Sequence, residues 1–143
     1  MKKKYIISFI IIVALLIASV IALGIISNVK MDELEDTKYY KIGEVEIKSI
    51  NYATSTSLNI ENYSYGKNSY EQKKHFEYSS NNASGVVGLY TEYLIADENF
   101  VITKEEDNFR ELKKEYETKD SLLVEISFKN DEIVLYLTYT YAK

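Results

Sequence analysis

The chain has 143 residues, a formal net charge of −5, no cysteine and no proline, but 14 tyrosines. An acidic chain repels nucleic-acid phosphates, which argues against a nucleic-acid partner, and a chain without cysteine forms no disulfide and no thiolate metal site. The residues that follow the N-terminal apolar segment suffice for one small domain with an ordinary apolar core.

The N-terminal segment has the pattern of a membrane anchor. Three lysines at positions 2–4 precede residues 5–27, which carry no charge, and acidic residues follow between Asp32 and Asp36. A helix over residues 5–27 rises about 34 Å at about 1.5 Å per residue, enough to cross a hydrocarbon core of about 30 Å. The lysines favour a cytoplasmic N-terminus. We therefore predict a single-pass protein of the cell membrane, with a cytoplasmic stub at 1–4, a transmembrane helix at 5–27, a juxtamembrane stalk at 28–41 and an extracytoplasmic domain at 42–143.

A cleaved signal peptide is the alternative interpretation of this segment. Ala22, Leu23 and Gly24 provide a small-x-small cleavage site, and cleavage there would release a secreted protein. The uncharged run is longer than the roughly 7–15 residues of a signal-peptide core, which favours the anchor. Within the predicted helix, Ala14, Ala18 and Ala22 recur at intervals of four, so they form a possible helix–helix contact that would bring two such helices together.

Alternating residues predict strands in the first half of the domain. Val45 and Ile47 alternate with charged residues, and the same period continues from Leu58 to Tyr65 with a slip of one residue that a β-bulge would explain. Residues 66–68 provide a turn. The strand over residues 70–78 places Phe76 and Tyr78 on one face, with His75 and Glu77 on the other.

A helix and two further segments follow in the middle of the domain. Between residues 84 and 97, the spacing of Val86, Leu89, Tyr90, Tyr93 and Leu94 is that of one helix face. Asn99 tolerates the left-handed conformation that ends a helix, and a short strand is expected from Phe100. Residues 108–117 fit either a short helix or an edge strand, of which the strand is favoured.

The last segment is the clearest hairpin in the sequence. Apolar residues alternate from Leu122 to Phe128 and again from Ile133 to Tyr141, on either side of a turn at residues 130–132. We predict an α+β domain in which an antiparallel sheet of about five to six strands carries one packed helix, preceded by the single N-terminal transmembrane helix.

The order of four segments carries a resemblance to known proteins. These segments are the stretch Tyr39–Gly43, the tyrosine-rich hairpin, the stretch Tyr93–Phe100 and the terminal hairpin. The chain is similar to small, functionally uncharacterised membrane-anchored proteins of low-GC Gram-positive bacteria. The resemblance implies an envelope location and the strand, helix and strand order, and it implies no activity.

Residues with catalytic chemistry are sparse. His75 is the only histidine, lies on the polar side of a charged strand and is expected to be solvated. The acidic runs lack the spacing of a calcium loop, and the glycines are too dispersed for a phosphate loop. We therefore predict no enzyme activity, no catalytic residue, no metal site and no cofactor.

Tyrosine is the one residue type in excess, and it combines apolar area with a hydrogen-bonding tip. Tyr63, Tyr65, Tyr70 and Tyr78 form the predicted interaction surface. High strand propensity is the competing reason for so many tyrosines. The sequence favours an interaction or accessory module with unidentified envelope proteins as partners, and a ligand- or glycan-binding sensory module is the alternative. Whether the protein forms a homo-oligomer is left open.

Overall fold

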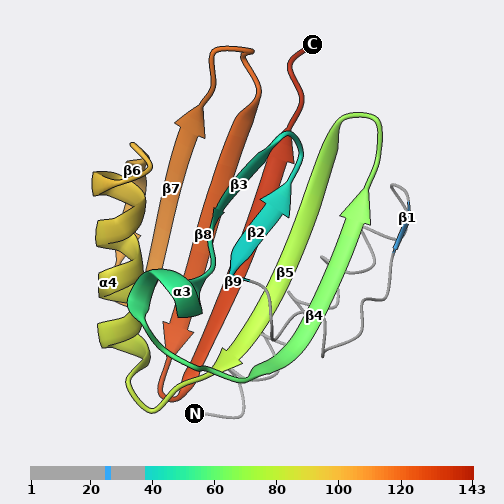
Figure 1. Ribbon diagram of the computed structural model, residues 1–143. Helices are drawn as coiled ribbons and strands as arrows, with labels where there is room; N and C mark the ends of the chain where they lie inside the picture. Colours follow the sequence, from blue (N-terminus) through green and yellow to red (C-terminus); the bar gives the residue numbers. More distant parts are fainter. Residues whose placement is uncertain (1–24, 27–37) are drawn as a thin grey trace.

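The computed structural model describes residues 25–26 and 38–143 of the chain (Figure 1). Its elements, in chain order, are β1 (Ile25–Ile26), β2 (Tyr39–Ile42), β3 (Val45–Lys48), α3 (Ile50–Thr54), β4 (Ile60–Lys67), β5 (Glu71–Ser79), α4 (Ala83–Ala96), β6 (Val101–Glu106), β7 (Phe109–Glu115), β8 (Ser121–Lys129) and β9 (Glu132–Thr140). In this part of the chain no helix is both long enough and apolar enough to cross a bilayer.

One antiparallel sheet forms the centre of the fold. Its strand order is β1-β4-β5-β9-β8-β7-β6, so six longer strands are extended at one edge by the two residues of β1. The last strand in sequence, β9, lies between β5 and β8, and its register pairs Phe76 of β5 with Leu135. The sheet therefore joins hairpins that are far apart in the sequence.

The elements on one face of this sheet enclose the apolar core. In Figure 1, α4, α3 and the β2–β3 hairpin all lie over the same side of the sheet. We call this side the covered face, and it carries Phe76, Leu135 and Leu137 among its fully or almost fully buried side chains. The opposite side, which carries His75 and Tyr136, is called the second face.

The predicted α+β class, the antiparallel sheet of about five to six strands and the packed helix are confirmed. The expected bulge lies between Ile60 and Asn62 of β4, and Asn99 has the expected positive φ of 62° just before Phe100. Residues 109–115 form the favoured strand, β7. This strand is internal, because β6 takes the edge position that was expected of residues 108–117.

The predicted start of the domain at residue 42 is too late. Tyr39–Ile42 form β2, and Tyr40 is 2% exposed inside the core. The last residues assigned to the stalk at 28–41 thus belong to the folded domain, because Tyr40 packs on Phe76 with ring centroids 4.7 Å apart. The short helix α3, capped by the Ser49 side chain, was not predicted at all.

The predicted transmembrane helix at residues 5–27 lies outside the described residues except for Ile25 and Ile26. These two residues form β1, which pairs with Gly66 and Lys67 of β4 in antiparallel orientation. The predicted stub at 1–4 and the helix–helix contact of Ala14, Ala18 and Ala22 also lie outside the described residues.

Candidate functional site

The four tyrosines of the predicted interaction surface do not form one exposed patch. Tyr70 is 69% exposed, Tyr63 and Tyr65 are half-buried, and Tyr78 is only 2% exposed. The register explains the difference, because Tyr63 faces Phe76 across β4 and β5 and therefore points to the covered face. Tyr78 has to be removed from the predicted surface, since it belongs to the core.

The hydroxyl of Tyr78 has a structural partner in Tyr40. The two phenol oxygens lie 2.6 Å apart, and the Tyr40 oxygen also accepts a hydrogen bond from the backbone N–H of Ile50 at 3.0 Å. Burial raises the pKa of both tyrosines above its ordinary value. Both hydroxyls therefore act as neutral hydrogen-bonding groups that connect β2, β5 and the start of α3.

Two tyrosines of α4 hold the end of β3 in a similar way. The Tyr90 hydroxyl donates to the carbonyl of Lys48 at 2.8 Å, and the Tyr93 hydroxyl accepts from the Lys48 N–H at 2.8 Å. Tyr93 in turn donates to Glu98 Oε1 at 2.9 Å. These contacts give the backbone carbonyl and N–H of Lys48 hydrogen-bond partners at the end of β3. Tyr90 and Tyr93 therefore have a structural role in the core.

The buried carboxylate of Asp120 lies at the C-terminal end of β9. Asp120 is 8% exposed and accepts from the Tyr139 hydroxyl at 2.5 Å and from the Ala142 N–H at 2.7 Å. The hydrogen bond from Tyr139, followed by that from Ala142, lowers the pKa of the Asp120 carboxyl below its ordinary value. Asp120 is therefore an ionised structural group that fixes the chain after β9.

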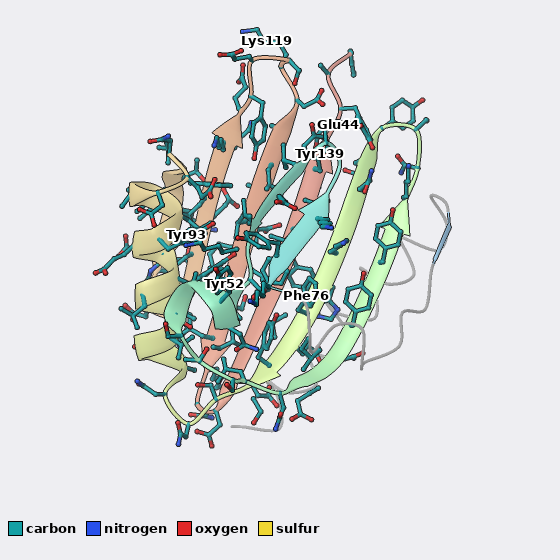
Figure 2. All side chains as sticks on the ribbon, viewed as in Figure 1. Glu44, Tyr52, Phe76, Tyr93, Lys119 and Tyr139 are labelled. Atoms are coloured by element: carbon teal, nitrogen blue, oxygen red, sulfur yellow. The ribbon has the colours of Figure 1, made fainter. Side chains whose placement is uncertain are left out.

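A cluster of two tyrosines and two lysines lies on the outer side of the β2–β3 hairpin and α3, with Lys38 and Tyr52 exposed and Tyr39 and Lys48 half-buried. Tyr39 and Tyr52 meet edge to face with ring centroids 5.4 Å apart, and Tyr52 remains 42% exposed. Lys38 Nζ and Lys48 Nζ lie 5.5 Å and 5.2 Å from the Tyr52 ring centroid. We call these four residues the hairpin patch; Figure 2 labels Tyr52 beside α4 and its Tyr93.

The hairpin patch was missed from the sequence because its members come from three short segments. Lys38 and Tyr39 were assigned to the stalk, and Tyr52 belongs to the unpredicted α3. The pKa of the Tyr39 hydroxyl is raised, mainly by the hydrogen bond between Tyr39 and Tyr52. Aromatic residues are enriched at recognition surfaces, and Tyr52 is the exposed ring of this patch.

The second face holds His75, and the expectation of a solvated histidine is wrong. His75 is 4% exposed and stacks on Tyr136 with ring centroids 4.6 Å apart. Its Nδ1 lies 3.3 Å from Ser64 Oγ and its Nε2 lies 3.4 Å from Glu77 Oε1, whereas the Tyr136 hydroxyl forms no hydrogen bond among the described residues. Buried polar atoms are normally paired, so the Tyr136 hydroxyl has capacity for a partner.

The acidic runs of the sequence do not converge in the described domain. Within residues 25–26 and 38–143, no group of three or more His, Asp or Glu side chains is placed to hold a metal ion. Several carboxylates form exposed ion pairs with lysines instead, such as Glu106 with Lys104 at 3.4 Å.

Comparison with known proteins assigns no family. No protein-family model matches the chain, and no significant match to a curated protein or to a solved structure was found. The resemblance to membrane-anchored proteins of low-GC Gram-positive bacteria therefore stays a prediction.

Proposed function

We propose that this chain is a single-pass membrane protein whose extracytoplasmic α+β domain acts as an interaction or accessory module in a bacterial envelope. The observation that carries the proposal is the order of the N-terminal residues, with three lysines, an uncharged run and then an acidic stretch. This order anchors a helix and keeps the lysines in the cytoplasm. The folded domain then faces the outside.

The hairpin patch is the surface that supports an interaction role. Aromatic residues are enriched in protein interfaces, and a tyrosine side chain loses little conformational entropy when it is bound. Tyr52 is exposed while its ring is held by Tyr39 and flanked by Lys38 and Lys48. The patch therefore fits an envelope protein that presents acidic and apolar side chains together.

A second candidate function is recognition of an acidic glycan. A sugar ring stacks on an exposed aromatic face, and the adjacent ammonium groups of Lys38 and Lys48 would pair with its carboxylate or phosphate. The same four residues support this sensory or ligand-binding module. The two candidates differ in the material that is bound at Tyr52.

The experiment is photo-crosslinking in cells from single positions of the full-length protein. A photoreactive phenylalanine derivative replaces Tyr52, and the matched control carries it at Asp131, an exposed residue in the turn between β8 and β9. We expect a discrete adduct from position 52 that is lost when Lys48→Glu is added. A polypeptide in the adduct supports the interaction module, and a glycan supports the second candidate.

Two results would contradict the proposal. The absence of any adduct specific to position 52 would remove the hairpin patch as an interaction surface. Recovery of the protein from the medium with a start near residue 25, instead of from membranes, would identify residues 1–24 as a signal peptide.

A further inference from the structure

The direction of β1 defines which end of the domain the N-terminal segment enters. Ile25 pairs with Lys67 and Ile26 with Gly66, so β1 runs antiparallel to β4. The chain therefore enters β1 at the end of the sheet where β4 turns into β5. We call this the entry end, and it also carries Glu44 and Lys119, which Figure 2 labels at the top of the view.

Tyr70 is the most exposed large hydrophobic side chain of the described residues, and it lies at the entry end. It occupies the turn between β4 and β5 and is 69% exposed. Asn68 Oδ1 accepts from the N–H groups of Tyr70 and Glu71 at 2.7 Å and 2.9 Å. The Tyr70 carbonyl accepts from the Tyr141 N–H at 2.9 Å. The phenol ring thus projects from a backbone that is held on both sides.

We infer that the entry end faces the lipid bilayer and that Tyr70 inserts its ring into the headgroup region of that bilayer. The inference rests on the proposed membrane anchor and adds the orientation of the domain. Tyrosine is a residue that favours this region, because its ring is apolar and its hydroxyl stays hydrated.

The length of the uncharged N-terminal run supports the lipid bilayer as the surface that the entry end faces. Because Ile25 and Ile26 form β1, the predicted helix at 5–27 is reduced to residues 5–24, and 20 helical residues would rise about 30 Å, which is about the thickness of the hydrocarbon core. Ile25 follows without a spacer, so the lipid surface has to lie within a few residues of β1. The nearest part of the domain is then the turn with Tyr70.

The entry end carries charges of both signs. Lys67 and Lys119 are exposed there together with Glu44, Glu115 and Glu117, so this end offers no basic surface to anionic headgroups. Docking therefore depends on ring insertion more than on attraction to anionic lipid.

The test uses the absence of cysteine, which makes single-site labelling clean. Full-length Tyr70→Cys and Asp131→Cys proteins are labelled with an environment-sensitive fluorophore and placed in phosphatidylglycerol–phosphatidylethanolamine vesicles. The headgroups of both leaflets carry a spin-label quencher, so the direction of insertion does not matter. We expect loss of emission at position 70 and full emission at position 131, because Asp131 lies at the opposite end of the sheet.

A second variant keeps the tyrosine in place. With the fluorophore at Ser69→Cys, quenching is expected in the otherwise native protein and a smaller loss of emission after Tyr70→Ser. Equal quenching at positions 70 and 131 would overturn the orientation, and no effect of Tyr70→Ser would overturn ring insertion. Flotation separates these failures from failure of the anchor, since a protein that does not float with the vesicles contradicts the proposed function itself.

Discussion

The hydroxyl of Tyr40 connects three elements, so its removal tests whether tyrosine serves the core. Tyr40→Phe keeps the ring but leaves the Tyr78 hydroxyl and the buried Ile50 N–H without this partner. An unpaired buried polar group costs about 1–3 kcal/mol, and we expect a loss of that size in the free energy of unfolding. Denaturant unfolding followed by tyrosine fluorescence measures it. The control Tyr70→Phe should change stability little, because that ring is exposed; equal effects of the two variants would contradict the assignment.

Asp120 provides a pH-dependent contribution to stability. Its pKa is lower in the folded state because Tyr139 and the Ala142 N–H donate to the ionised carboxylate. The contribution is therefore complete above the ordinary pKa of about 4 and is lost as the pH falls through the lower folded value. We expect Asp120→Asn to be less stable at neutral pH and to lose less stability on acidification.

Acid titration of thermal unfolding checks this prediction for Asp120. The exposed Asp131→Asn serves as the matched control and should retain the profile of the unmodified protein. If Asp120→Asn had the same acid profile as the unmodified protein, the Tyr139–Asp120 contact would not be a source of the pH dependence.

The helix α4 contains a glycine whose replacement should increase stability. A Cβ added at Gly88 meets nothing within 4 Å, and glycine in a helix interior costs up to about 1 kcal/mol relative to alanine. We therefore expect Gly88→Ala to raise the free energy of unfolding by about 0.5–1 kcal/mol. Thermal or denaturant unfolding measures the change.

The turn between β2 and β3 provides the opposite case. Gly43 has φ +58°, and a Cβ there would clash with the ring of Tyr139. Gly43→Ala should therefore destabilise the domain, since both the backbone conformation and the packing on Tyr139 oppose a side chain. A neutral result would show that the hairpin can move away from β9.

Local patterns predicted the long elements, because their period follows from one buried face. The alternation in β8 and β9 and the helical spacing in α4 each repeat over nine residues or more. The α3 helix has only five residues and β2 four, too few to define a period. The burial of His75 also escaped prediction, because it depends on the pairing of β5 with β9 about 60 residues further along the chain.

The tyrosine-rich core should make the whole domain sensitive to alkali. Burial raises the pKa of Tyr63 and Tyr116 to about 12, and it raises those of Tyr40 and Tyr90 well above their ordinary value. The folded state then retains protons that the unfolded state releases above about pH 10, so stability falls as the pH rises through that range. We expect cooperative alkaline unfolding in which tyrosinate absorbance and loss of circular dichroism coincide.

A different order of events would contradict this expectation. If tyrosinate absorbance rose fully near pH 10 while the circular dichroism stayed native, the buried phenols would not be coupled to folding. The ordinary pKa of tyrosine near 10 sets that reference.

The candidate site was less predictable than the fold. Tyrosine composition alone could not separate buried from exposed tyrosines. Tyr78 and Tyr70 belong to the same hairpin, but Tyr78 lies within β5 and is buried, whereas Tyr70 lies in the turn before β5 and is exposed. The hairpin patch requires the fold itself, because Tyr52 meets Tyr39 only when α3 packs beside β2. Exposure of an aromatic ring is thus a property of the assembled domain.

The central position of β9 has a consequence for synthesis. Because β9 pairs with both β5 and β8, the β4–β5 hairpin and the β6–β7–β8 meander have no common strand until residues 132–140 have emerged. A growing chain then carries two separate half-sheets in which one edge each of β5 and β8 has unpaired backbone groups, and such edges favour aggregation. We therefore expect the nascent domain to be most prone to aggregation between the completion of β5 and the arrival of β9.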